Sequence, residues 1–127
     1  MIYGVGTDIV EVGRIEKALA RFGDRFAKRI LCPPELKRFE HHRQKANYLA
    51  KRFAAKEAFT KALGTGIHAP ANWHGVWVKN LPSGKPVLEF SEPLAALLKS
   101  RGVGGSHLSL TDEKGIAMAT VILERAA

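Results

Sequence analysis

Residues 44–63 read QKANYLAKRFAAKEAFTKAL, and this segment predicts the longest helix of the chain. Its apolar side chains, among them Tyr48, Phe59 and Leu63, recur at helical spacing and form a predicted buried face. Gly64-Thr65-Gly66 follows directly and is a typical helix stop. The segment also carries charged residues that the helix would hold in a fixed spacing, and the rest of the fold is predicted around it.

The flanking sequence predicts strands and shorter helices. Residues 2–10 alternate as a strand, with Gly4 and Gly6 permitting close backbone approach. A helical pattern starts at Val12 and is broken by Gly23, and a short helix is expected near residues 36–40. Strands are predicted at 73–81, 86–90, 107–111 and 116–123, with one helix after Ser91. We therefore expect one α+β domain over residues 1–127, with a mainly antiparallel sheet packed on the long central helix.

Composition narrows the class of protein. The chain has 127 residues, of which 46% are hydrophobic and 25% charged, as in a globular domain. No apolar run is long enough to span a membrane, and the amino terminus does not resemble a signal peptide. Cys32 is the only cysteine, which excludes an internal disulfide and fits a cytoplasmic location.

The positive charge is concentrated in one half of the chain. The net charge is +8 overall, with 14 Lys and Arg against 7 Asp and Glu in residues 1–63. Such an excess predicts an anionic partner: a nucleic acid, a nucleotide, a membrane surface or an acidic protein. Solubility alone is the alternative explanation.

Asp8 and Glu57 form a candidate metal site. A carboxylate at the end of a predicted strand and another on the long helix could share one divalent cation, while Lys56 and Lys61 flank the second carboxylate. The arrangement is typical of phosphoryl-type chemistry. Asp8 could instead accept backbone hydrogen bonds, and Glu57 with Lys61 could be a simple helical ion pair worth about 0.3–0.5 kcal/mol.

Two motifs carry a resemblance to a known family. Residues 6–12, GTDIVEV, and residues 53–62, FAAKEAFTKA, are similar to the 4′-phosphopantetheinyl transferase family. The short chain, residues 64–66 and the segment HLSLTD at 107–112 resemble its acyl-carrier-protein type. The resemblance implies Mg²⁺-dependent transfer of 4′-phosphopantetheine from coenzyme A to a serine of apo-acyl carrier protein. The products would be the holo-carrier protein and 3′,5′-ADP, in support of fatty acid biosynthesis.

The resemblance also assigns catalytic roles. Asp8 and Glu57 would ligate Mg²⁺, and Lys61 would hold a phosphate and protonate the leaving group. The base that activates the serine stays open between Glu57, a metal-bound water and a partner carboxylate. Val10 stands where larger relatives carry another acidic residue, so we expect a water in that metal position.

Coenzyme A contacts are expected from several segments. They are Lys61, Gly64, Thr65, Lys56, Ser83 and His107. Lys56 is interpreted as a phosphate contact in preference to a structural partner. His107 would approach a nucleotide phosphate, with a backbone-satisfied strand histidine as the alternative. The Gly64-Thr65-Gly66 turn would offer N–H groups to phosphate, and both turns could also be plain turns.

The helix after Asp8 predicts a second surface. Arg14, Lys17, Arg21 and Arg25 recur at steps of three, four and four. The family resemblance implies that they dock the acidic helix of acyl carrier protein, whereas most such stripes are solvated faces. It also implies a homotrimer with active sites between subunits.

Two rival functions remain from the residues alone. A basic nucleic-acid-binding module is supported by the charged half and by Phe39, Tyr48 and Phe53, although these fall at core helical positions and no nucleic-acid motif is present. A nucleotide-binding protein without transferase activity is the other. We therefore expect no nucleic-acid partner and no membrane association.

Overall fold

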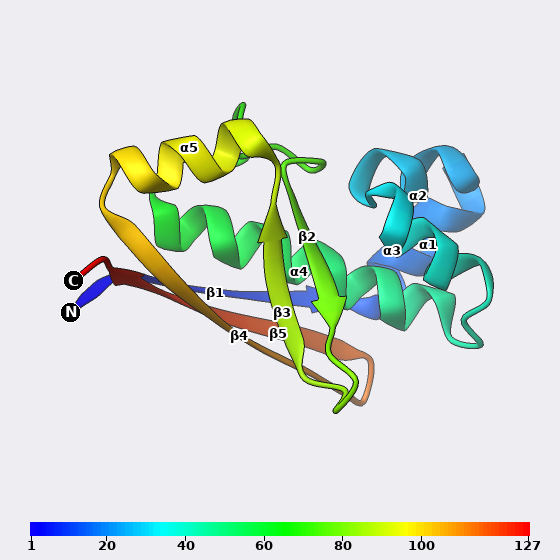
Figure 1. Cartoon of the computed structure of the whole chain (residues 1–127). Helices are drawn as coiled ribbons and strands as arrows, with labels where there is room; N and C mark the ends of the chain where they lie inside the picture. The colour runs from blue at the N-terminus through cyan, green and yellow to red at the C-terminus, as the bar shows by residue number, and fades with distance from the viewer.

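The computed structural model describes all of residues 1–127. In chain order the elements are β1 (Ile2–Glu11), α1 (Val12–Phe22), α2 (Asp24–Ile30), α3 (Pro33–Glu40), α4 (Lys45–Leu63), β2 (Val76–Asn80), β3 (Pro86–Phe90), α5 (Glu92–Ser100), β4 (Val103–Glu113) and β5 (Ile116–Arg125) (Figure 1).

The strands form two antiparallel sheets. A three-stranded sheet has the order β1-β5-β4, and β2 and β3 pair as a separate hairpin. The long helix α4 lies against the larger sheet, and α5 lies on the helix's other side (Figure 1). The β2–β3 hairpin crosses α4 and reaches the sheet beside β4, while α1, α2 and α3 gather at one end (Figure 1). The predicted α+β class with a long central helix is confirmed.

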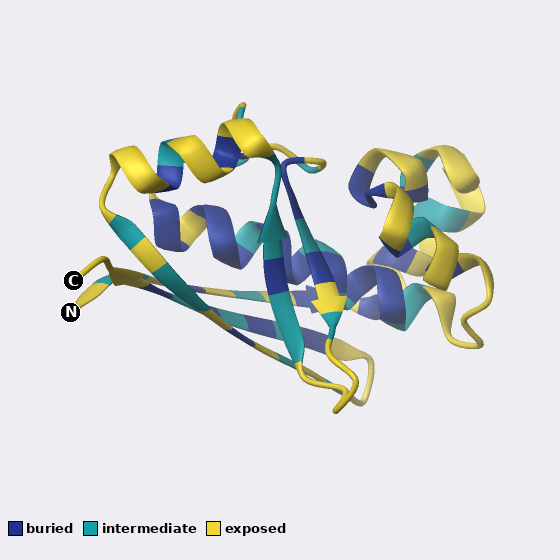
Figure 2. Cartoon of the chain, in the orientation of Figure 1, coloured by how far each residue is buried: buried dark blue, intermediate teal, exposed yellow.

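Helix α4 is buried on most of its sides. Its buried residues include Leu49, Ala55 and Phe59, which are 0% exposed, and its ribbon is largely dark blue in Figure 2. The core comprises 27 buried hydrophobic residues drawn from the helices and strands. Most of the other helices and strands pack directly on α4.

Two glycines bring β1 close to α4. A Cβ atom at Gly4 would collide with the Ala62 carbonyl, and one at Gly6 would collide with the Ala58 carbonyl. Only glycine permits this approach. The close contact places the side chain of Asp8, on the same face of β1, beside the carboxyl-terminal half of α4.

The opposite face of the sheet is open. Ile2, Val5 and Ile9 of β1 are 57%, 52% and 61% exposed. Val5 pairs with Ile122 of β5, which in turn pairs with His107 of β4, so these side chains share the face away from α4. An apolar sheet face therefore lies uncovered in the single chain.

Some predicted boundaries are wrong. Strand β2 begins at Val76, because Gly75 N–H closes a turn on Asn72 and residues 73–75 leave the ladder. Strand β4 begins at Val103 and includes Gly104 and Gly105, where the sequence offers no alternation of apolar and polar side chains. Strand β1 continues to Glu11, so Asp8 lies inside the strand and not at its end.

Candidate active site

Asp8 faces α4 from an edge strand. Strand β1 pairs only with β5, where Asp8 lies opposite Ala119, and its side chain is 16% exposed. Lys61 Nζ donates to Asp8 Oδ1 at 3.1 Å and to the Thr7 carbonyl at 3.0 Å. Lys61 is itself 53% exposed, so its ammonium reaches solvent as well as the carboxylate.

The second oxygen of Asp8 has no partner. Asp8 Oδ2 is buried and accepts no hydrogen bond. A buried polar atom is almost always satisfied, and an isolated buried carboxylate oxygen is costly. The atom therefore has the property expected of a metal ligand, because a cation would satisfy it.

Glu57 is electrostatically coupled to Asp8. Burial raises the pKa of the Glu57 carboxyl, the negative charge of Asp8 raises this pKa further, and Lys61 opposes both effects. Two carboxylates that repel each other in this way favour a shared cation. No group of three His, Cys, Asp or Glu side chains gathers in the chain, and the Val10 side chain, which is 4% exposed, offers no ligand.

The carboxylate pair fits magnesium by its chemistry. Mg²⁺ binds hard oxygen ligands and commonly keeps several waters, with only one or two protein carboxylates and substrate phosphates completing its shell. Asp8 and Glu57 supply two such carboxylates, and Asp8 Oδ2 is free to bind. The donor set is therefore suitable for Mg²⁺ bound together with a phosphate ligand.

Lys56 does not share this site. Its side chain is 0% exposed, and Nζ lies 2.7 Å from Glu35 Oε1, 2.6 Å from the Ile30 carbonyl and 2.7 Å from the Trp73 carbonyl. Every ammonium proton has an acceptor inside the protein. The interpretation of Lys56 as a phosphate contact is therefore corrected, and the structural alternative describes its contacts.

The turn after α4 uses its N–H groups internally. Gly64 has a φ of 89°, the left-handed conformation typical of a helix end. The N–H groups of both Gly64 and Thr65 donate to the Thr60 carbonyl, at 2.8 and 3.1 Å. The expectation that these two groups bind phosphate is therefore wrong; the Gly66 N–H alone has no backbone partner in this turn.

Ser83 and His107 make no hydrogen bond or ion pair with Asp8. Ser83 is exposed in the β2–β3 turn, where its Oγ accepts a hydrogen bond from Lys85 N–H at 3.4 Å. His107 is exposed on the open face of the larger sheet, on the strand farthest from β1, with Nε2 3.4 Å from Glu124 Oε2. His107 and Ser109 point the same way, as predicted, but a single chain does not bring His107 to Asp8 and Glu57.

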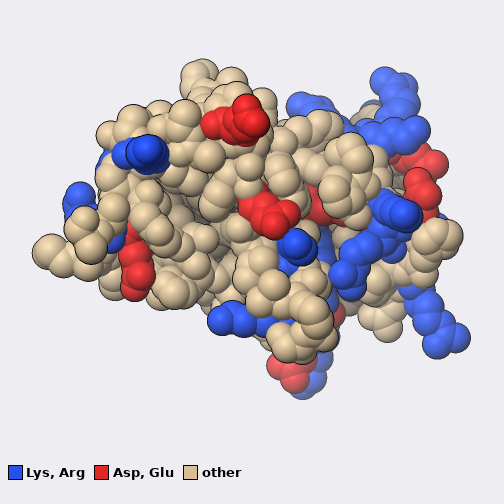
Figure 3. Space-filling model, viewed as in Figure 1, with Lys and Arg blue, Asp and Glu red and all other residues tan.

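The basic stripe spans two helices. Arg14, Lys17 and Arg21 lie on α1, whereas Arg25 lies on α2 because Gly23, with a φ of 63°, ends the first helix. All four side chains are exposed. Figure 3 shows Lys and Arg side chains gathered at the end of the molecule formed by α1, α2 and α3.

The sequence reasoning missed Glu35 and the buried role of Cys32. Glu35 is 1% exposed and caps α3 by accepting Cys32 N–H at 2.9 Å. Burial raises the pKa of the Cys32 thiol to about 11, so the thiol stays protonated near neutral pH. A glutamate at the third position of a helix that opens with Pro33-Pro34 is a capping signal, and it could have identified Glu35.

The fold and the pairing of Asp8 with α4 define a class of protein. The chain belongs to the 4′-phosphopantetheinyl transferase superfamily, whose sequence pattern it matches over residues 4–120. It is 51% identical to the holo-[acyl-carrier-protein] synthase of Vibrio cholerae over 125 residues, which is 98% of this chain and 99% of that protein. It is 52% identical to the protein of the same name from Pseudoalteromonas atlantica, over 97% of each chain.

Solved structures agree with the sequence comparison. The crystal structure of holo-[acyl-carrier-protein] synthase from Neisseria meningitidis superposes with a TM-score of 0.95 at 43% identity, covering 98% of this chain and 100% of that one. The Bacillus anthracis synthase, in complex with CoA (3′,5′-ADP), gives a TM-score of 0.83 at 36% identity, covering 100% and 99%. No helix of this chain is both long and apolar enough to cross a membrane.

Proposed function

We propose that this protein transfers 4′-phosphopantetheine from coenzyme A to a serine hydroxyl of apo-acyl carrier protein, releasing 3′,5′-ADP. The observation that carries the proposal is the convergence of Asp8, Glu57 and Lys61 from β1 and α4. Relatives of about 50% identity over almost the whole chain carry the name holo-[acyl-carrier-protein] synthase. The fold, the charged groups and the relatives point to one reaction.

Mg²⁺ is the proposed metal, held by Asp8 and Glu57. Support comes from the unpartnered Asp8 Oδ2 and from the pKa of Glu57, which burial raises first and the negative charge of Asp8 raises further. When bound, the metal would neutralise charge on the pyrophosphate of coenzyme A. No third carboxylate is required, since water and phosphate oxygens complete a magnesium shell.

Lys61 and Glu57 divide the remaining chemistry. The exposed ammonium of Lys61 can reach a phosphate while staying beside Asp8, and it is our candidate for protonating the departing 3′,5′-ADP. Glu57 is our first candidate for accepting the serine proton, because its carboxylate lies on the helix face that also carries Lys61 and interacts with Asp8. A metal-bound water and a carboxylate of the partner are the other candidates for the base that accepts the serine proton.

The basic stripe is proposed to dock acyl carrier protein. Arg14, Lys17 and Arg21 on α1, with Arg25 on α2, present exposed cations to an acidic partner. Opposite charge steers association and is screened by salt. The docked helix would lie at the end of the molecule where α1 follows directly from β1, four residues after Asp8.

We also propose a homotrimer with shared active sites. The open sheet face exposes Ile2, Val5 and Ile9, and an exposed apolar patch of this kind is typical of an interface. His107 lies on that face, so in an assembly it could meet the Asp8 site of a neighbouring chain. Ser83, together with Lys61, is retained as a coenzyme A contact, whereas Lys56 and the N–H groups of Gly64 and Thr65 are not.

The proposed setting is fatty acid biosynthesis in the cytoplasm. Acyl carrier protein is the acceptor named for the relatives, and the single cysteine, Cys32, is a free thiol as expected in a reducing compartment. We propose that residues 1–127 act as one domain, supported by the shared core around α4.

One experiment tests the function. The protein is incubated with coenzyme A, Mg²⁺ and apo-acyl carrier protein, and the carrier protein is then weighed by mass spectrometry. We expect a gain equal to one 4′-phosphopantetheine. An unchanged carrier mass, together with tight oligonucleotide binding, would favour the nucleic-acid alternative. That alternative has little support, because Phe39 and Tyr48 are buried and Phe53 stacks on Trp73.

A further inference from the structure

A buried ion pair lies one residue from Glu57. Lys56 of α4 and Glu35 of α3 are joined at 2.7 Å, and both side chains are 0% exposed. The same ammonium donates to the carbonyl of Ile30, the last residue of α2, and to that of Trp73 in the segment before β2. One side chain of α4 thus holds three other segments of the chain.

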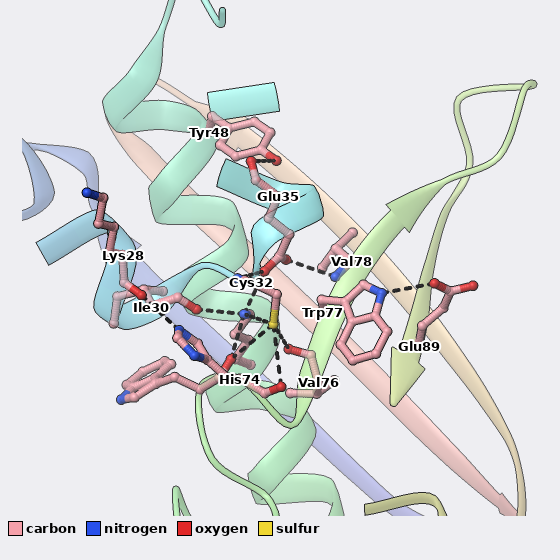
Figure 4. A network of polar contacts seen from close by, with 12 residues as sticks. Lys28, Ile30, Cys32, Glu35, Tyr48, His74, Val76, Trp77, Val78 and Glu89 are labelled. Carbon is pink, nitrogen blue, oxygen red and sulfur yellow. Dashed lines mark hydrogen bonds and ion pairs between the residues drawn. The ribbon is translucent and has the colours of Figure 1, made fainter. Parts of the chain in front are cut away.

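Glu35 extends the network in the other direction. Its Oε1 accepts Cys32 N–H and its Oε2 accepts Val78 N–H, each at 2.9 Å, while its backbone carbonyl accepts the Tyr48 hydroxyl at 2.9 Å. In Figure 4 Glu35 lies between Tyr48 on one side and Val78 of β2 on the other, with Cys32 below it. The pair therefore links α2, α3 and β2 to α4.

Stability alone is a weak reason for such a pair. Removing two charges from water costs about as much as their attraction returns, and apolar replacements of buried pairs are often neutral or stabilising. The distinctive contribution of the pair is positional, because each directional hydrogen bond fixes one acceptor group relative to α4. Apolar packing alone holds helix α2 only weakly in place, since the helix has seven residues and only Ala27 and Ile30 are buried.

We propose that the Lys56–Glu35 pair is a positioning device that fixes the carrier-docking helix α2 relative to Glu57. Lys56 directly precedes Glu57 in α4, and its hydrogen bond to the Ile30 carbonyl holds the last residue of α2, the helix that carries Arg25. The inference rests on the proposed function, in which α1 and α2 dock the carrier protein. Lys56 acts through α2 and touches neither substrate.

The test removes both charges together. The double variant Lys56→Met/Glu35→Gln leaves no buried unpaired charge, so we expect it to stay folded by circular dichroism and thermal unfolding. Transfer is measured with the carrier protein varied at saturating coenzyme A, and coenzyme A binding is measured separately by calorimetry. We expect the KM for the carrier protein to rise about tenfold. The dissociation constant of coenzyme A should stay within about twofold of the value for the unmodified protein, because the pair is proposed to position the carrier-docking helix α2 and not the coenzyme A site.

The chain offers a matched control. Lys79→Met/Glu89→Gln makes the same chemical changes in an exposed pair, whose charged atoms are 3.6 Å apart in the β2–β3 hairpin. It should leave the carrier KM unchanged. Tyr48→Phe removes only the hydroxyl that holds the Glu35 carbonyl, and this mild variant should raise the carrier KM about twofold at unchanged coenzyme A affinity.

The outcomes are separable. An unchanged carrier KM in the folded double variant overturns the inference, as does an equal loss of coenzyme A affinity, which would mean that the pair shapes the nucleotide site. If the double variant does not fold, Tyr48→Phe decides, and an unchanged carrier KM there also overturns it. Absence of transfer by the unmodified protein would instead refute the proposed function.

Discussion

Asp8 is the residue on which the candidate site depends. One of its oxygens is paired with Lys61, and the other is buried with no partner. Its charge also raises the pKa of Glu57, so the two carboxylates are energetically linked. Such a pair is unfavourable without a cation, which explains why these side chains are expected to bind metal rather than to stabilise the fold.

Replacing Asp8 by Asn should remove the negative charge at this position while leaving the fold intact. In Asp8→Asn the pKa of Glu57 should fall toward its ordinary value in the metal-free protein, because one of the two causes that raise it is removed while burial remains. NMR titration of the Glu57 carboxyl measures this shift. Transfer should fall by about a hundredfold or more, with thermal unfolding little changed. An unmoved Glu57 pKa would contradict the proximity of the two carboxylates.

At the scale of elements, the contact between β1 and α4 creates the site. Gly6→Ala would drive a Cβ atom into the Ala58 carbonyl. We expect a loss of about 1–3 kcal/mol in the free energy of unfolding, as for other overpacked positions. Transfer should fall as well, because the displaced strand carries Asp8 away from α4.

Gly13→Ala is the control for this substitution. Its Cβ would meet nothing within 4 Å on helix α1, and alanine is favoured over glycine in helices by about 0.5–1 kcal/mol. Denaturant unfolding compares the two variants. A Gly6→Ala protein as stable as the Gly13→Ala protein would show that the close approach of β1 and α4 is not required.

Helix α1 should control the affinity for the carrier protein. Arg14→Ala should raise the carrier KM by about two- to tenfold and weaken its dependence on salt, because one steering charge is lost. The kcat should change little. Lys99→Ala removes an exposed cation from the last turn of α5 and should leave both constants unchanged; an equal effect of the two substitutions would argue against a docking surface on α1.

Helical spacing allowed part of the site to be predicted from sequence. The spacing puts Glu57 and Lys61 on one helix face, and both interact electrostatically with Asp8 in the structure. The interpretation of Lys56 as a phosphate contact is wrong because sequence does not reveal that residues 30, 35 and 73 fold over its side chain. Sequence predicts the turn at Gly64. It does not reveal that the N–H groups of Gly64 and Thr65 donate to the Thr60 carbonyl, because this depends on the backbone geometry of the helix end.

At the scale of the whole molecule, the open sheet face is the feature that a single chain does not explain. Val5→Glu places a charge among its exposed apolar side chains, opposite Ile122. We expect the variant to remain folded but to sediment as a monomer, since a buried charge without a partner opposes association. Leu81→Glu, at an exposed residue of the β2–β3 turn, should leave the oligomeric state unchanged. A Val5→Glu protein of unmodified size would contradict the proposed interface.

The separation of Asp8 and His107 on opposite faces of one sheet has a genetic consequence. If each site takes Asp8 from one chain and His107 from the next, two variants with different substitutions can complement each other in a mixed assembly. Asp8→Asn and His107→Ala chains, each expected to be strongly impaired alone, should regain transfer when refolded together, because random assembly of the two in equal amounts rebuilds about a quarter of the sites. Mixing after each has assembled separately should restore nothing until subunits exchange. Two defective alleles in one cell would then complement, although neither encodes a working chain.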